Sequence, residues 1–240
     1  MEPLHIHEVH LWCARPETLA AHAAYAAARA LLTADEAERL ERFAFTRDRL
    51  IFLATRALVR RVLSRYAPVA PKDWRFAITD RGCPEVERES GPPLRFNLSN
   101  TRGLVICGVV GEGEIGVDVE PVRADAPLGL AGHYFAPAEI AALRALPPPA
   151  QSTRFFEYWT LKESYLKARG VGLGLPLDRF SFSLDAGRSP RFEVDAALDD
   201  HGDAWRFSLC RPTADHVAAL CVRPPQPRDV RVVLRWERLG

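Results

Sequence analysis

Two short charged motifs in the second half of the sequence have the residue types and spacing that metal-assisted chemistry requires. Asp118 and Glu120 lie two residues apart in an alternating, β-branched segment, so a strand would project both carboxylates from one face while Val117 and Val119 face the core. Adjacent carboxylates repel each other unless protons or a cation intervene, and Mg²⁺ prefers a few carboxylates together with water and substrate phosphates. The motif predicts either a magnesium site or, alternatively, a solvated strand face beside a turn.

The second motif, Lys162-Glu163 followed by Lys167, lies in a segment with helical spacing. Glu163 and Lys167 are four residues apart in the favourable order, so one interpretation is an exposed helix pair worth about 0.2–0.5 kcal/mol. The segment is, however, rich in apolar and aromatic residues, which predicts burial around much of the helix. Only three of the 32 Lys and Arg residues are lysines, and two of these are Lys162 and Lys167. The two lysines are either chance survivors of a codon bias or mark a site that needs a compact ammonium group.

Other motifs in the sequence do not predict a site. Residues 111–116 match the glycine spacing of dinucleotide-binding loops, but a strand-like segment follows them instead of a helix, which excludes that class. His5, His7 and His10 have no partner at metal-ligand spacing and are interpreted as residues of a surface strand. The five cysteines are dispersed without a CxxC pair, so neither a disulfide framework nor a zinc site is expected.

Hydrophobic periodicity predicts the elements that position the two motifs. Thr33 and Glu36 have the spacing of a capping box at a helix start. Gly111-Glu112-Gly113 is expected to join two strands as a hairpin turn. Helices are expected over residues 16–32, 47–66, 135–146 and 152–169, with Gly170 as the cap of the last. Strands are expected over residues 5–12, 74–78, 94–99, 104–110, 115–119, 180–184, 205–210, 217–222 and 230–236.

The order of these elements predicts an α+β fold of two similar halves. Each half contains a short helix, a long helix and several strands, and the segments that precede the two long helices resemble each other loosely. We place the halves at residues 1–113 and 114–240, so that the C-terminal half carries both charged motifs. A ligand site is expected at the seam between the halves.

Composition limits the class of partner. The 240 residues are 48% hydrophobic and 26% charged with a formal net charge of +1, so the chain should fold independently and has no basic excess for nucleic acid or an anionic membrane. The N-terminal segment lacks the basic and apolar regions of a secretory signal, and no run approaches the roughly 18 apolar residues of a membrane span. We therefore expect a reduced, cytoplasmic protein that binds neither nucleic acid nor a membrane.

Several segments of the chain, in order, resemble the surfactin-type (Sfp-type) 4′-phosphopantetheinyl transferases. The most specific are the Gly-Val-Asp-Val-Glu run at 116–120 and the Trp-x-x-Lys-Glu-x-x-x-Lys pattern at 159–167. The similarity covers most of the chain, and the order and spacing of its motifs are those of the family. The other segments that carry it are residues 42–48, 96–100, 172–177 and 180–182.

The resemblance implies an enzyme that transfers the 4′-phosphopantetheine arm of coenzyme A to a serine of an apo acyl or peptidyl carrier protein, releasing adenosine 3′,5′-bisphosphate. It also implies two similar α/β halves related by a pseudo-twofold axis, and a monomer. By resemblance, Asp118, Glu120 and Glu163 hold Mg²⁺, Glu163 is the candidate base for the serine, and Lys167 neutralises the departing phosphate. The resemblance does not select among fatty-acid, polyketide and peptide carriers.

The coenzyme A contacts transfer less completely from the family. By resemblance they are Arg39 and Arg47 for the 3′-phosphate, Ser99 and Asn100 of the 96–100 motif, and Lys162 and Lys167. The family commonly has His where this chain has Asn100, and Gly-Lys-Pro where it has Gly82-Cys83-Pro84. Asn100 can donate a neutral hydrogen bond but supplies no charge, so coenzyme A affinity depends on other cations.

Two further hypotheses stay open at the level of sequence. The replacements at Cys83 and Asn100 fit a non-catalytic binder of a carrier protein or of coenzyme A. The three acidic residues also fit a Mg²⁺-dependent nuclease, although the near-neutral net charge argues against nucleic acid as substrate.

Overall fold

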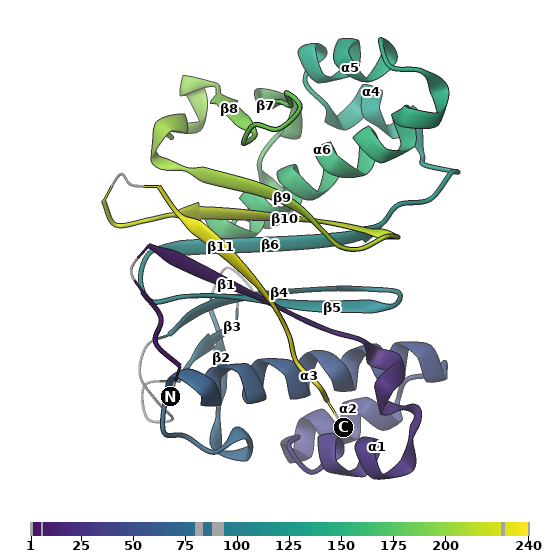
Figure 1. The fold of residues 1–240 in the computed structure, drawn as a ribbon, viewed down its shortest axis with the longest axis vertical. Helices are drawn as coiled ribbons and strands as arrows, with labels where there is room; N and C mark the ends of the chain where they lie inside the picture. Colours follow the sequence, from purple (N-terminus) through teal and green to yellow (C-terminus); the bar gives the residue numbers. More distant parts are fainter. Residues whose placement is uncertain (1, 6, 80–83, 88–93, 227–228, 240) are drawn as a thin grey trace. The chain divides into compact units, whose positions relative to one another are not determined.

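The computed structural model describes residues 2–5, 7–79, 84–87, 94–226 and 229–239 and shows an α+β chain that divides into two compact units (Figure 1). Unit 1 consists of Met1–Glu112 together with Val230–Gly240, and unit 2 is Gly113–Asp229. Gly82, Cys83 and Arg81 lie outside the described residues, so the Gly-Cys-Pro turn stays an expectation. In the described part of the chain, no helix has both the length and the apolar character needed to cross a lipid bilayer.

Unit 1 packs a long helix against one face of a sheet. The sheet has the order β11-β1-β5-β4, in which β11 is parallel to β1 and the other pairs are antiparallel. Its strands are β1 (Glu8–Ala14), β4 (Arg95–Thr101), β5 (Leu104–Val110) and β11 (Arg231–Trp236), and β2 (Phe76–Ile78) and β3 (Pro84–Val86) form a separate hairpin. The helices are α1 (His22–Arg29), α2 (Ala34–Glu41) and α3 (Thr46–Tyr66), with short 3₁₀ turns at Pro16–Ala20 and Pro71–Asp73.

Unit 2 has the same kind of core. Its sheet has the order β6-β10-β9, fully antiparallel, and a two-stranded hairpin of β7 and β8 lies apart from it. The strands are β6 (Glu114–Pro121), β7 (Phe180–Ser183), β8 (Arg191–Val194), β9 (Arg206–Thr213) and β10 (His216–Arg223). The helices are α4 (Ala131–Tyr134), α5 (Pro137–Arg144) and α6 (Pro148–Arg169), with 3₁₀ turns at Leu128–Leu130, Gly172–Gly174, Leu177–Arg179, Ala196–Leu198 and Gly202–Ala204.

The two units repeat one order of elements. In each, a first strand is followed by short helices, a long helix, a two-stranded hairpin and a final antiparallel pair, and the first strand pairs with the last of these. The sheet orders β1-β5-β4 and β6-β10-β9 therefore correspond, and β11 is an addition to the first. The apolar residues of α3 pack against the sheet of unit 1, and those of α6 pack against the sheet of unit 2. Each helix therefore belongs to a separate hydrophobic core.

Two expectations about connectivity are wrong. The last strand, β11, belongs to unit 1 rather than to a half running from 114 to 240, because it adds to the edge of β1 in parallel register from Glu8 with Arg231 to Cys13 with Trp236. Gly111-Glu112-Gly113 is not a hairpin turn, because β5 pairs with β1 and β4 whereas β6 pairs with β10. These glycines instead connect one unit to the next, and Gly113 has a left-handed φ of +97°.

Candidate active site

Helix α6 begins and ends where its sequence directs. Prolines occupy its first turn, where a missing backbone N–H costs nothing, and Gly170 closes it with a left-handed φ of 64°. The expected helix and its glycine cap are confirmed, but the helix begins at Pro148 instead of at residue 152. The middle of α6 is buried on several sides, at Phe155, Phe156, Tyr158, Thr160, Leu161, Lys162, Ser164, Tyr165 and Leu166.

Strand β6 places its two carboxylates on the face that contacts α6. Gly116, Asp118 and Glu120 alternate with Val117 and Val119, so the first three share a face. At Gly116, a methyl group would overlap the backbone oxygen of Ser164 and the backbone nitrogen of Ala168. The absence of a Cβ therefore lets β6 approach the α6 backbone, and this approach brings the strand's carboxylates to the helix.

Lys167 connects the helix to the strand. Its ammonium nitrogen lies 2.7 Å from Oδ1 of Asp118 and donates to the backbone oxygen of Val117 at 3.1 Å. The Asp118 side chain is 8% exposed and that of Lys167 is 30% exposed, so the pair is largely removed from water. Glu163 lies one helical turn before Lys167 on the same side of α6. The expected juxtaposition of the two motifs is thus present in this unit.

Two carboxylates of this site, those of Glu120 and Glu163, have raised pKa values. Burial raises the pKa of Glu120 to about 7, and the negative charges of Asp118 and Glu163 add to the effect while Arg123 and Lys167 oppose it. Burial also raises the pKa of Glu163, with a further contribution from Asp118 against Lys167. Charge effects of this kind require close approach, and they identify a region of concentrated negative charge.

The carboxylates of Asp118, Glu120 and Glu163 have the ligand type and the charge that a hard divalent cation requires, but they are not arranged as a complete coordination site. Among the described residues, no three His, Cys, Asp or Glu side chains are arranged to hold a metal ion. The Lys167 ammonium instead lies at Asp118, where it supplies positive charge. Oxygen ligands with mutual repulsion are nevertheless the environment that Mg²⁺ stabilises. Asp118, Glu120 and Glu163 therefore remain candidate ligands.

A separate pocket of about 450 Å³ in unit 1 contains two of the expected coenzyme A contacts. Arg39, at the end of α2, and Asn100, on β4, both line it. Arg39 lies over the ring of Phe52 at 5.4 Å, and Arg56 lies over the same ring at 5.3 Å. Two guanidinium groups therefore border a pocket that also contains an aromatic ring, which is suitable for a phosphorylated aromatic ligand. Its described lining is Arg39, Phe43, Asp48, Ile51, Phe52, Thr55, Arg56, Leu98 and Asn100.

Sequence reasoning missed the contribution of α3 to this pocket. Five of the lining residues recur along α3 at spacings of three, one, three and one, which is one face of a helix; they are Asp48, Ile51, Phe52, Thr55 and Arg56. The same spacing is visible in the sequence, and the guanidinium of Arg56 on that face could have indicated that α3 contributes a cation to the pocket. Arg56 is held 3.4 Å from Glu36, whose other oxygen accepts from Arg60 at 2.7 Å.

Two expected contacts are not brought into this pocket. Arg47 starts α3 and bonds its neighbour Asp48 at 3.1 Å, and it is not among the described lining residues. Ser99 is 5% exposed and lies between Leu98 and Asn100, both of which line the pocket. Because strand side chains alternate, the Ser99 side chain belongs to the opposite face of β4.

Comparison with known proteins identifies the family. The model of the 4′-phosphopantetheinyl transferase superfamily matches residues 114–221, and that of the 4′-phosphopantetheinyl transferase N-terminal region matches residues 19–110. The chain is 34% identical to the 4′-phosphopantetheinyl transferase HetI of Nostoc sp. over 90% of this chain and 87% of that protein. The chain belongs to the 4′-phosphopantetheinyl transferase superfamily. The superfamily transfers phosphopantetheine from coenzyme A to carrier proteins, so the chain is an enzyme with that activity.

This chain has two further relatives that are named as phosphopantetheinyl transferases. It is 29% identical to the 4′-phosphopantetheinyl transferase Sfp of Bacillus subtilis over 87% of this chain and 90% of that protein. It is 28% identical to the L-aminoadipate-semialdehyde dehydrogenase-phosphopantetheinyl transferase of Mus musculus over 80% of this chain and 67% of that protein. A solved holo-[acyl-carrier-protein] synthase of Thermotoga maritima overlaps 45% of this chain and 61% of its own, with 22% identity and a TM-score of 0.37.

The expected coenzyme A contact of Lys162 is not supported by the geometry around its ammonium group. Lys162 is fully buried, and its ammonium group has three acceptors at 2.8 Å: Oε2 of Glu139 and the backbone oxygens of Leu177 and Phe180. An ammonium group has three hydrogens, so Lys162 has none left for coenzyme A. Burial lowers the pKa of Lys162, and the Glu139 carboxylate acts in the opposite direction.

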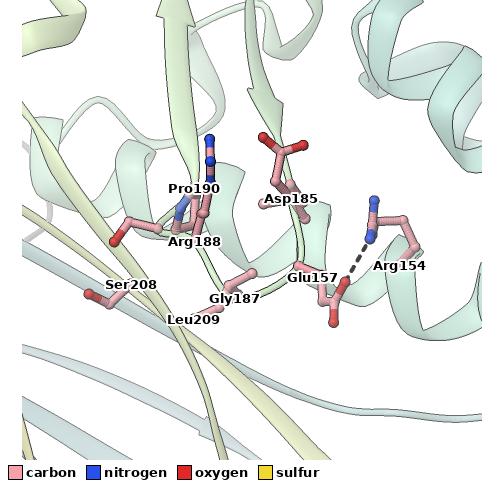
Figure 2. Close-up of a pocket in the computed structure, with 11 residues that line it drawn as sticks. Arg154, Glu157, Asp185, Gly187, Arg188, Pro190, Ser208 and Leu209 are labelled. Atoms are coloured by element: carbon pink, nitrogen blue, oxygen red, sulfur yellow. Dashed lines mark hydrogen bonds and ion pairs between the residues drawn. The ribbon is translucent and has the colours of Figure 1, made fainter.

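Unit 2 of the transferase also has a pocket, and none of the predicted site residues lines it. Figure 2 shows this pocket of about 440 Å³, between the first half of α6, the turn after β7 and strand β9. Arg154 donates to Glu157 at 3.0 Å across its border, so these two charges neutralise each other (Figure 2). We assign it no part in the transfer.

Proposed function

We propose that the transferase is Mg²⁺-dependent and that Asp118, Glu120 and Glu163 hold the ion. The observation that carries this proposal is the convergence of β6 and α6, where burial and the negative charge of Asp118 raise the pKa of both Glu120 and Glu163 beside the ammonium group of Lys167. When bound, Mg²⁺ would neutralise negative charge on the diphosphate of coenzyme A. Residues of this type and arrangement match the metal motif of the family.

The chain's own residues have separate tasks in the proposed reaction. The carrier serine hydroxyl forms a new P–O bond to the phosphorus attached to pantetheine, and the bond from that phosphorus to the adenosine bisphosphate breaks. Glu163 accepts the serine proton, directly or through water, and its raised pKa makes it a stronger base than an exposed glutamate. Lys167 supplies positive charge where the leaving phosphate gains negative charge.

The pocket of unit 1 is proposed to bind the nucleotide end of coenzyme A. Arg39 is the cation for the 3′-phosphate, Asn100 donates a neutral hydrogen bond, and Arg56 joins Arg39 as a second cation of the pocket. This second guanidinium offers a reason why the family's histidine is dispensable here. The remaining expected contacts, Arg47 and Ser99, have less support because neither lines the pocket.

The acceptor in this proposal is an apo acyl or peptidyl carrier protein, and the enzyme acts as a monomer in the cytoplasm. Two units with a repeated order of elements in one chain support the monomer. The cysteines that the structure describes are free thiols, which is the usual state in a reducing compartment; they are Cys13, Cys107, Cys210 and Cys221.

The proposal is tested by incubating the enzyme with coenzyme A, Mg²⁺ and a panel of apo acyl and peptidyl carrier domains, and measuring carrier mass. At least one carrier should gain about 340 Da, the mass of the phosphopantetheine arm, and chelation of the metal should stop the gain. Transfer that continues unchanged in excess chelator would overturn the metal proposal. Tight binding of coenzyme A or carrier by folded enzyme, without mass gain on any carrier, would favour a non-catalytic binder.

A further inference from the structure

The first lysine of the Trp-x-x-Lys-Glu-x-x-x-Lys motif belongs to a buried cluster that none of the transfer chemistry uses. Lys162 donates to Glu139 and to the backbone oxygens of Leu177 and Phe180. Glu139 in turn accepts from the backbone N–H groups of Ala136 and Phe182, each at 2.9 Å. Both side chains are fully buried. The side chains of Lys162 and Glu139 thus make five polar interactions, which join α5, α6, β7 and the 3₁₀ turn before β7.

A cluster of this kind needs a reason beyond stability. A buried ion pair gains little over well-packed apolar residues, because removing both charges from water offsets much of their attraction. What a fully satisfied pair does supply is directional constraint, since each hydrogen bond fixes a position and an angle. The ammonium of Lys162 is held at three points on the side of α6 that faces α5 and β7.

Glu163 follows Lys162 directly in the helix, so the two side chains leave the axis about 100° apart. The Lys162 side chain is fixed to α5 and β7, and the Glu163 side chain is on the side of α6 where Lys167 contacts Asp118 of β6. The roll of α6 about its own axis therefore sets the position of Glu163. A roll of about 10° displaces a group about 6 Å from the axis by about 1 Å.

We infer that Lys162 and Glu139 are positioning residues for the transfer, which fix the roll of α6 so that Glu163 and Lys167 face the carboxylates of β6. This inference rests on the proposed site. It assigns to the motif's first lysine a structural connection to α5 in place of a ligand contact, and it adds Glu139 to the residues on which the reaction depends. A misplacement of about 1 Å lowers a rate by as much as about 100-fold.

The test compares Lys162→Met and Glu139→Gln with the wild type in steady-state kinetics, at a temperature where each variant is fully folded by circular dichroism. We expect kcat to fall by about 10- to 100-fold in both, with the KM for coenzyme A within about threefold of the wild-type value. Half-maximal activity should also require more Mg²⁺, because the ligands are displaced. The double variant should lose no more than the worse single variant, because both changes release the same cluster.

Two controls separate positioning from general weakening of the helix. Thr160→Val removes a buried hydroxyl of α6 that donates to the backbone oxygens of Phe156 and Glu157 in the same helix, and Lys72→Met removes the lysine outside α6. Both should keep wild-type kcat. If Glu139→Gln does not fold, Glu139→Asp retains the charge on a shorter side chain. That variant should lower kcat in the same direction, without a change in the coenzyme A KM.

The results that would overturn the inference are distinct from those that would overturn the proposed function. A coenzyme A KM raised tenfold or more in Lys162→Met, with Glu139→Gln unaffected, would restore Lys162 as a ligand contact. If Lys162→Met and Glu139→Gln lower the melting temperature but leave kcat unchanged, the Lys162–Glu139 ion pair has a structural role only. In either case wild-type transfer still stops in excess chelator and Glu163→Gln is inactive, whereas failure of the proposed function gives wild-type transfer that continues in excess chelator, or no transfer to any carrier.

Discussion

At the level of single residues, the Lys167 ammonium group and the proposed Mg²⁺ would both bind the carboxylate of Asp118. Lys167 bonds Asp118 at 2.7 Å, so any cation that binds there must share Asp118 with it. The residue types and their spacing singled out Asp118, Glu120, Glu163 and Lys167, and the resemblance to the family predicted their roles. They were not enough for Lys162, because its acceptors lie in segments distant in sequence, and spacing alone does not show which side of a helix faces which neighbour.

Arg39 provides the residue-scale test of the pocket in unit 1. Arg39→Ala should raise the KM for coenzyme A by about tenfold or more, because a charge-assisted hydrogen bond to phosphate contributes about 1.5–3 kcal/mol, and kcat should change by less than about twofold. Dephospho-coenzyme A, which lacks the 3′-phosphate, should discriminate much less between Arg39→Ala and wild type. Arg29→Ala, which removes an exposed guanidinium paired with Glu41, is the matched control. Equal KM values in Arg39→Ala and Arg29→Ala would exclude Arg39 from the site.

At the level of elements, the site depends on how closely one strand approaches one helix. Periodicity predicted the end of α6 but missed its first turn, and it predicted β6 to within two residues at each end. The Thr33 capping box is confirmed by both of its hydrogen bonds, at 3.3 and 3.1 Å. The hairpin expected at residues 111–113 was wrong because glycine-rich turns between two strands do not specify that the strands pair. Gly116 was interpreted as part of a rejected dinucleotide motif and of the family motif at 116–120, and neither interpretation predicted its close contact with α6.

Gly116→Ala should separate β6 from α6. The added methyl group meets backbone atoms of Ser164 and Ala168, which cannot rotate away, so the free energy of unfolding should fall by about 1–3 kcal/mol. We also expect kcat to fall at least tenfold in the folded variant, because Asp118 moves with the strand. Gly111→Ala is the control, since a methyl group there meets nothing within 4 Å. Equal stability and kcat in the two variants would show that the close approach has no role.

At the level of the whole molecule, the chain is two units with a repeated order of elements, and the last strand returns to the first unit. The repeat could be predicted from the alternation of short helix, long helix and strands. The return of β11 could not, because pairing of residues 8–13 with 231–236 leaves no local signal in either segment. Burial was also missed in this sheet: His10, interpreted as a residue of a surface strand, is fully buried on β1.

His10 gives unit 1 a pH-dependent stability. Its Nδ1 lies 2.6 Å from the Tyr66 hydroxyl and its Nε2 lies 3.3 Å from Glu8, with Arg235 and Glu2 also nearby. Burial lowers the pKa of His10 below 6.5, with Arg235 acting in the same direction against Glu8 and Glu2. The unfolded chain therefore binds a proton at a pH where the folded protein does not, and His10 destabilises the fold as the pH falls below about 6.5.

Denaturant titrations between pH 5 and pH 8 measure this effect. The free energy of unfolding should decrease on acidification below about pH 6.5, with His10 contributing at most about 1.4 kcal/mol per pH unit. His10→Asn should be less stable at pH 8 but should lose less stability on acidification than wild type. An identical pH dependence in wild type and His10→Asn would remove His10 as the origin of the effect.

The most direct test of the proposed chemistry compares two glutamates on the same helix. Glu163→Gln changes the proposed base and metal ligand, and Glu157→Gln changes a glutamate of α6 that pairs with Arg154. The measurement is the mass of an apo carrier over time with coenzyme A and Mg²⁺. Glu157→Gln should convert the carrier at the wild-type rate, whereas Glu163→Gln should be slower by at least about 100-fold while remaining folded. Conversion by Glu163→Gln at the wild-type rate would contradict the assignment of the transfer chemistry to this site.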